Sequence, residues 1–221
     1  MPKLEKSDLL EWFSSGAKPS KEWKIGTEHE KFVFYIKNFE RVNYSGPSGI
    51  SELLDTVAKK NNWDKIIENN NTIGLKDDTG ASISLEPGGQ LELSGTPLDN
   101  LHQTCKETGL HLKIMKEVMK ELGLSMVGVG YDPKWAQSEI SLMPKGRYEI
   151  MKNYMPKVGK LGLDMMLRTC TIQVNLDYSS EKDMVEKFQI SLALQSVATA
   201  LFANSPFIEG KESGYLSARA M

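Results

Sequence analysis

The chain has 221 residues, of which 40% are hydrophobic, so it can bury a substantial core as one large domain or two small ones. Its net charge of −2 gives no electrostatic reason to expect a nucleic acid or an anionic membrane as a partner. The start lacks the features of a signal peptide, and the most apolar stretch, residues 190–203, is too short for a membrane span. Cys105 and Cys170 are too few for a disulfide framework, so the sequence predicts a cytoplasmic protein.

Five segments have the apolar spacing of helices, namely 7–14, 50–60, 98–122, 146–154 and 182–203. Gly123 is a natural stop for the third helix, and the apolar part of the last one is expected to be buried.

Strands are predicted between these helices, at 24–36, 72–76, 81–94, 125–130 and 165–178. The run Asp-Asp-Thr-Gly at 77–80 predicts a hairpin turn between the second and third strands. Helices and strands mix without a regular βαβ alternation, and no linker or internal repeat divides the chain. We therefore expect one α+β domain over residues 1–221, with an antiparallel sheet backed by helices on one face.

The first strand contains an unusual face. Side chains alternate along a strand, so Glu28 and Glu30 point to the same side as Phe32 and Phe34. If this side meets a core, the two carboxylates need partners or a metal ion.

The later strands carry further polar faces. Ordinary exposure to water explains such alternation in many antiparallel sheets. However, the polar positions of 82–94 and 169–177 contain no Lys or Arg, although the chain has 27 of them. A surface of carboxylates, amides and hydroxyls suits a hard divalent cation such as Mg²⁺ or Mn²⁺. We predict that Glu86 and Glu92 join Glu28 and Glu30 if these strands are neighbours.

Other motifs are weak. The chain has no P-loop, no dinucleotide fingerprint and no GxSxG elbow. His29 falls on the strand face opposite the glutamates, and His102 with Cys105 lacks the second pair that a zinc site needs. Arg147 and Arg219 are either ordinary surface residues or clamps for a carboxylate or phosphate.

Four stretches together resemble the glutamate–cysteine ligases of the plant and proteobacterial type, in the right order and from about residue 20 onward. They are "IGTEHEKF", "ISLEPGGQLELSG", the long segment from "MPKGRYEIM" to "NLDYSSE", and "GYLSAR".

This resemblance implies a glutamine-synthetase-like domain whose antiparallel strands form part of a funnel that binds Mg²⁺ (or Mn²⁺) and ATP. The implied reaction joins the γ-carboxylate of L-glutamate to L-cysteine through an acyl phosphate, the first step of glutathione synthesis. The resemblance places the metal ligands at Glu28, Glu30, Glu86, Glu92 and Gln173, and the substrate-binding residues at Arg147 and Arg219.

The same resemblance predicts that the chain is the N-terminal half of such an enzyme, inactive alone, because family members continue beyond Met221. Two alternatives remain open: a carboxylate–amine ligase with a different acceptor amine, and a non-catalytic half that binds metal or glutamate. Self-association or a completing C-terminal polypeptide is expected, since an open sheet edge invites pairing.

Overall fold

The computed structural model describes residues 3–221 and contains a seven-stranded sheet in which every ladder is antiparallel. The strand order is β2-β3-β4-β5-β1-β6, and β7 also pairs with β1. The strands are β1 Ile25–Tyr35, β2 Asp64–Glu68, β3 Asn71–Lys76, β4 Ser82–Leu85, β5 Leu91–Ser94, β6 Leu124–Val127 and β7 Ile172–Leu176, with a separate hairpin of β8 Phe207–Ile208 and β9 Lys211–Glu212.

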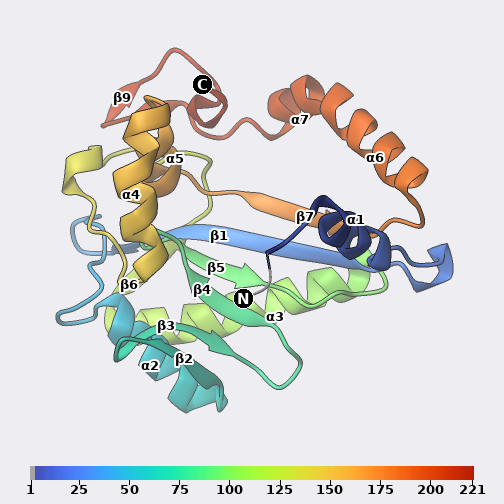
Figure 1. Cartoon of the computed structure of the whole chain (residues 1–221). Helices are drawn as coiled ribbons and strands as arrows, with labels where there is room; N and C mark the ends of the chain where they lie inside the picture. The colour runs from blue at the N-terminus through green and yellow to red at the C-terminus, as the bar shows by residue number, and fades with distance from the viewer. Residues whose placement is uncertain (1–2) are drawn as a thin grey trace.

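Helices lie on both sides of this sheet (Figure 1). They are α1 Lys6–Ser15, α2 Ile50–Asn61, α3 Leu101–Leu122, α4 Gly146–Val158, α5 Gly162–Arg168, α6 Glu181–Ala193 and α7 Gln195–Phe202, with 3₁₀ turns at Ser20–Glu22, Gln137–Glu139 and Ala218–Ala220. α2 and α3 cover one face, whereas α4 and α5 lie across the other, so the expectation of helices on a single face is wrong (Figure 1). No helix within residues 3–221 combines the length and apolarity needed to cross a bilayer.

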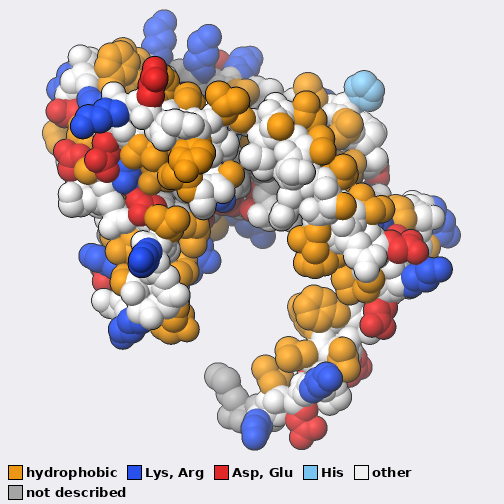
Figure 2. All heavy atoms as spheres, turned by 90° about the horizontal axis from the view of Figure 1, so that it is seen from above, with side chains coloured by type: hydrophobic (Ala, Val, Ile, Leu, Met, Phe, Trp, Pro, Cys, Tyr) orange, Lys and Arg blue, Asp and Glu red, His pale blue; other side chains and the backbone are white. Residues whose placement is uncertain are grey.

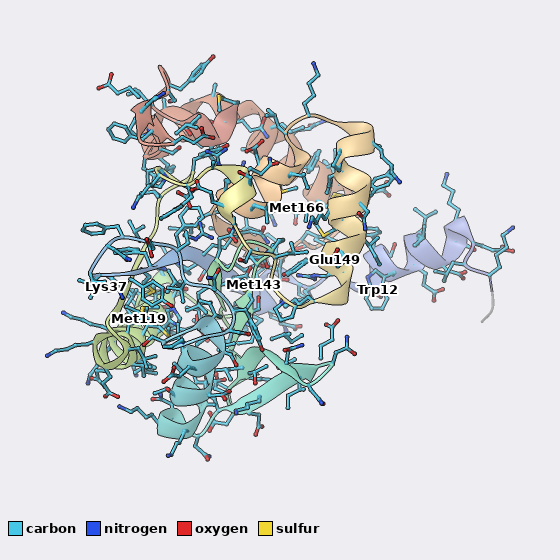
Figure 3. All side chains as sticks on the ribbon, turned by 90° about the vertical axis from the view of Figure 1, so that its left-hand side faces the viewer. Trp12, Lys37, Met119, Met143, Glu149 and Met166 are labelled. Atoms are coloured by element: carbon cyan, nitrogen blue, oxygen red, sulfur yellow. The ribbon has the colours of Figure 1, made fainter. Side chains whose placement is uncertain are left out.

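The main core lies between the sheet and the layer of α2 and α3. α2 contributes an apolar stripe, as its spacing predicts, and α3 faces it with residues that include Met115 and Met119. The sheet supplies alternate side chains such as Val33, Ile83 and Leu91. Figure 3 shows Met119 in the lower layer and Met166 of α5 in the upper layer, with buried Met143 between them.

β1 is the central strand and separates two environments. On one face, His29 lies close to Thr108 of α3, with 3.4 Å between Nε2 and Oγ1, which confirms that this histidine faces away from the glutamates. On the other face, Phe32 is buried beneath the guanidinium of Arg41, 4.7 Å from the ring centroid. Glu28 and Glu30 therefore share a face with a phenylalanine that has its own packing partner, outside the main core.

Several predictions from local sequence are confirmed. The hairpin between β3 and β4 turns at 77–80, where the backbone N–H of Asp77 donates to the carbonyl of Ala81. Gly80 there has φ +98°, a conformation that favours glycine. Gly123 ends α3 in the left-handed conformation, as predicted. The structure adds a cap at the start of α3, where the Asn100 side chain accepts from the N–H groups of His102 and Gln103.

Two predicted strands are each divided. Residues 81–94 form β4 and β5, joined by the turn 86–90, because Pro87, Gly88 and Gly89 reverse the chain there. Residues 165–168 belong to α5 instead of extending β7, and β2 was absent from the sequence-based prediction. Glu86 therefore stands at a turn and not in the middle of a strand.

The expectation of one buried helix over 182–203 is wrong. This segment forms α6 and α7, interrupted at Leu194, and neither contains a buried residue. The apolar side chains of β7, Ile172, Val174 and Leu176, are also exposed. Seen from above, the molecule has an open hollow and many apolar side chains at its surface (Figure 2).

His111 of α3 makes the stability of the fold sensitive to acid. The side chain is 4% exposed, and burial together with the charge of Lys31 lowers the pKa of its imidazole to about 4. The unfolded chain, with a pKa near 6.5, binds this proton first, so stability falls as the pH drops from about 6.5 to about 4. We expect His111 to account for a loss of about 3 kcal/mol in the free energy of unfolding over this range.

Urea unfolding at pH 7.5 and pH 4 measures this loss. His111→Leu should show a smaller difference between the two pH values, whereas His102→Leu, at an exposed position of the same helix, should behave as the parent. An unchanged pH dependence in His111→Leu would contradict the assignment.

Candidate functional site

Three carboxylates gather where β1 meets the β4–β5 hairpin. Glu30 and Glu92 are direct cross-strand partners, and Glu86 begins the turn between β4 and β5. Burial raises the pKa of Glu86 to about 7, and the charges of Glu92 and Glu30 contribute to the rise. Burial and, to a smaller extent, Glu92 also raise the pKa of Glu30. We call Glu30, Glu86 and Glu92 the carboxylate cluster.

Glu30 and Glu92, the two cluster residues that lie on strands, each accept a hydrogen bond from a neighbouring group. The backbone N–H of Thr171 donates to Oε2 of Glu30 at 3.0 Å, and the hydroxyl of Ser94 donates to Oε1 of Glu92. The residual acceptor capacity of these oxygens is available to a cation.

Glu28 belongs to a second group, further along β1 toward its N-terminal end. The side-chain amides of Gln173 and Asn175 on β7 both donate to Oε1 of Glu28, at 2.9 and 2.8 Å. Glu28 and Gln173 are cross-strand partners, and both β7 residues are exposed. The structure thus brings Gln173 to Glu28 and leaves the carboxylate cluster as a separate set.

Basic side chains reach the carboxylate cluster from outside the strands. Nη2 of Arg147 lies 3.8 Å from Oε1 of Glu86, and the Arg147 side chain is 64% exposed. The charge of Arg219 acts on Glu30 in the direction that lowers its pKa. Lys145, by contrast, is buried, and burial lowers the pKa of its ammonium group although Glu86 and Glu92 oppose this effect.

The start of the Glu86 turn is fixed by α4. The carbonyl of Leu85, immediately before Glu86, accepts a hydrogen bond from Nζ of Lys145 at 2.7 Å. The hydroxyl of buried Tyr148 donates to the same carbonyl. The backbone position from which the Glu86 side chain projects is therefore held by two donors from one helix end.

The rest of the turn is held from two further directions. Arg41 donates to the carbonyl of Gly88 and forms a buried ion pair with Asp132. Gln90 is 1% exposed, accepts from the N–H of Gly88, and donates to the carbonyls of Met166 and Thr169 at 3.2 and 2.8 Å. These bonds tie the hairpin that carries Glu86 and Glu92 to the segment that leads into β7.

Gly88 allows this close packing, because an added Cβ would lie 2.4 Å from the carbonyl oxygen of Leu167. Gly89 beside it has φ +81°.

The ligand atoms that the carboxylate cluster offers are all oxygen, which suits Mg²⁺ or Mn²⁺. Burial is the main cause of the raised pKa of Glu86, and the charges of Glu92 and Glu30 add to it. Nevertheless, no three His, Cys, Asp or Glu side chains among residues 3–221 are arranged closely enough to hold a metal ion. The cluster has the chemistry of a metal site in an open arrangement.

The structure thus unites three of the four predicted glutamates and places Arg147 beside Glu86, while Glu28 and Gln173 form the neighbouring pair. Arg219 makes no ion pair with the cluster among residues 3–221, although its charge acts to lower the pKa of Glu30. Sequence reasoning missed Lys145, Tyr148, Gln90 and Arg41. Lys145 stands two residues before Arg147 in the "MPKGRY" stretch, which was the one available signal. The strand faces do lack Lys and Arg, but helix α4 and the C-terminal segment bring positive charge to them.

The antiparallel sheet thus carries clustered carboxylates with a basic side chain, Arg147, at their rim. The Glutamate-cysteine ligase family 2 model matches residues 24–221, and the chain belongs to this family.

The relatives agree with this assignment. The chain is 58% identical over 217 residues to glutamate–cysteine ligase B, chloroplastic, of Oryza sativa subsp. japonica, which covers 98% of this chain and 43% of the relative. The corresponding protein of Medicago truncatula is 57% identical, with 98% and 42% covered, and that of Arabidopsis thaliana is 55% identical, with 98% and 41% covered.

The chain therefore spans about four tenths of the length of these relatives. All three relatives are named as chloroplastic proteins, which contradicts the cytoplasmic location expected from the sequence.

Proposed function

We propose that this chain forms part of the active site of an ATP-dependent glutamate–cysteine ligase. The observation that carries the proposal is the carboxylate cluster with Arg147 and Arg219 at its edge, in a chain that belongs to this ligase family. The sheet would form one part of a glutamine-synthetase-like funnel around ATP and the amino-acid substrates.

The proposed reaction has two steps. An oxygen of the glutamate γ-carboxylate attacks the γ-phosphorus of ATP, giving an acyl phosphate and ADP. The amine of cysteine then attacks the acyl carbon, phosphate leaves with the C–O bond electrons, and the amine loses a proton. Phosphoryl transfer depends mainly on positioning and on neutralising charge, and the side chains of this site are suited to both.

The residues take distinct roles in this proposal. Glu30, Glu86 and Glu92 would hold Mg²⁺ or Mn²⁺, with Glu28 and Gln173 at the neighbouring position. A bound divalent cation supplies positive charge to phosphate oxygens. Arg147 and Arg219 would orient a substrate carboxylate or phosphate, a task for which the guanidinium group is well shaped.

One observation favours the second candidate function, a half that binds metal or glutamate without catalysing the reaction. Glu28, Gln173 and Asn175 face solvent across β7, and α6 and α7 bury no residue. We infer that a further polypeptide covers this side, so the chain alone would bind metal or glutamate without completing the reaction. The acceptor amine is tested separately, by measuring ATP hydrolysis with glutamate and a panel of amines.

The metal assignment predicts a loss of affinity when a ligand is neutralised. Glu86→Gln and Glu92→Gln should each weaken Mn²⁺ binding by at least about tenfold, the size of effect found even for partners of metal ligands. Isothermal titration calorimetry with Mn²⁺ measures this change, and circular dichroism reports whether the fold is kept.

Glu149→Gln is the matched control, because Glu149 is an exposed glutamate on α4 (Figure 3). Equal Mn²⁺ affinity in all three variants and the parent would show that the cluster is not a metal site.

A further inference from the structure

The outer side of β6 is an unpaired sheet edge in the part of the chain that the structure describes. β6 ends the strand path, and within residues 3–221 its one ladder is with β1. The N–H of Ile36 donates to the carbonyl of Gly123 just before β6, so Gly123 is a position that faces β1. Because the direction of the N–H and C=O groups alternates along a strand, those of Leu124 and Met126 point away from β1. An edge of this kind is a template for one more strand.

A groove of about 440 Å³ runs beside this edge, between β6 and the C-terminal half of α3. Its apolar lining includes Leu112, which is 40% exposed, and Met119. The side chains of Leu124 and Met126 also point to this side of the sheet, where they pack with the main core. A strand added at the edge would therefore place every second side chain in the groove. The same residues would pair their N–H and C=O groups with those of Leu124 and Met126.

The charge around the groove is positive. Lys116 and Lys120 line it, and Lys37 lines a second cavity of about 400 Å³ that adjoins it at Ile36. Figure 3 shows Lys37 close to Met119 at this corner of the molecule. None of the three lysines forms a salt bridge with another of residues 3–221. An occupant that carries carboxylates would supply the opposite charge.

The groove lies away from the side that α6 and α7 leave uncovered. Figure 1 shows α6 and α7 above the sheet and α3 below it. A polypeptide that covers α6 and α7 would lie on the opposite face of the sheet, so the groove is available to a different partner.

We propose that the groove between β6 and α3 docks an extended acidic segment of a separate protein, which adds a strand to the free edge of β6. Main-chain hydrogen bonds would hold the segment, and the apolar lining with its lysines would select its side chains. The proposal does not use the carboxylate cluster, so it stands or fails independently of the proposed function.

The synthetic peptide Thr-Glu-Thr-Val-Thr-Glu-Thr, blocked at both ends, is the probe for residues 1–221. Its valine and its two glutamates share one face of a strand and would enter the groove, with the threonines on the other face. Hydrogen exchange measured by NMR is the readout. At nine-tenths occupancy the amides of Leu124 and Met126 should exchange about tenfold more slowly, because exchange then proceeds from the unbound tenth. The amides of Ser125 and Val127, which face β1, should change little.

Modified peptides test the pairing and the charge. A methyl group on the valine nitrogen removes the N–H that faces β6, and we expect it to weaken binding about fivefold or more. A methyl group on the nitrogen of a neighbouring threonine, whose N–H points to solvent, should have little effect. Replacing both glutamates by lysine should weaken binding about tenfold, because like charges then meet across the groove.

Substitutions in the chain test the lining. Lys116→Gln should weaken binding of the peptide about two- to fivefold, the range for an exposed ion pair. Leu112→Ser should also weaken binding, because apolar surface in the groove is lost. Lys106→Gln and Leu110→Ser are the matched controls, since both residues are exposed on α3 and neither lines the groove.

Three results would overturn the proposal. The first is unchanged exchange at Leu124 and Met126 with excess peptide, or equal binding of the glutamate and lysine peptides. The second is slow exchange at both amides before peptide is added, together with a dimer in sedimentation, which would assign the edge to a second copy of the chain. The third is protection of both amides by a polypeptide matching the remainder of the rice relative, which would place the occupant in that remainder and not in a separate protein.

Discussion

Residues 1–221 alone are expected to form γ-glutamylcysteine at least about a hundredfold more slowly than when mixed with a polypeptide matching the remainder of a relative. One missing donor to a developing charge costs about a hundredfold or more, and an uncovered site leaves its charges in water, where they interact weakly. The exposed Glu28–Gln173 pair and the apolar surface of α6 and α7 indicate which side is uncovered.

Chromatographic detection of product from glutamate, cysteine, Mg²⁺ and ATP measures this difference. The added polypeptide would be the part of the rice relative that this chain does not match. The match covers 43% of the rice relative, so this part is more than half of that relative. Repeating the mixture with Glu86→Gln serves as the control, since the gain should disappear if this chain provides the cluster. Fast turnover by a monomer of residues 1–221, shown by sedimentation, would overturn the prediction.

Substitution of Arg41 is expected to lower the stability of the fold strongly. Its guanidinium pairs with Asp132 in a buried setting, where the two side chains are 9% and 2% exposed. Arg41→Met leaves the Asp132 carboxylate buried with only the backbone donors of Lys134 and Trp135, at 2.9 and 3.0 Å. Removing one partner of a buried pair costs about 3–5 kcal/mol in the free energy of unfolding, and we expect a loss of this size.

Urea unfolding of Arg41→Met measures the loss, and Lys60→Met provides the comparison. Lys60 pairs with Glu121 at the surface, where both side chains are about half exposed, so its removal should cost less than about 1 kcal/mol. Adding Asp132→Asn to Arg41→Met should restore part of the stability, because the unpaired charge is then gone. Equal losses for Arg41→Met and Lys60→Met would contradict the buried-pair interpretation.

Arg41 also connects stability to the site, because its second bond holds the carbonyl of Gly88 in the Glu86 turn. Calorimetry of folded Arg41→Met with Mn²⁺ should therefore show weaker binding, although Arg41 does not belong to the carboxylate cluster.

Features that depend on neighbours in sequence were determined by the sequence itself. Alternation along β1 places Glu28 and Glu30 on one face and His29 on the other, because successive side chains of an extended strand point in opposite directions. The apolar stripe of α2 and the turn at 77–80 likewise follow from spacing and from the conformational freedom of Gly80.

Features that depend on residues distant in sequence were decided only by the tertiary structure. Gln90 reads as one more polar position of a strand, yet it is buried, because the carbonyls of Met166 and Thr169 satisfy its amide. Lys145 lies 59 positions from Glu86 (145 minus 86) and reaches the cluster only because α4 crosses the sheet there.

The apolar run 190–203 is another feature whose burial the local sequence does not determine. Its composition indicates a helix that belongs in a core, and the structure forms helices there, but burial requires a partner surface. Local sequence determines that α6 and α7 form and that their side chains are apolar, whereas the contacts that would bury them depend on what packs against them in space.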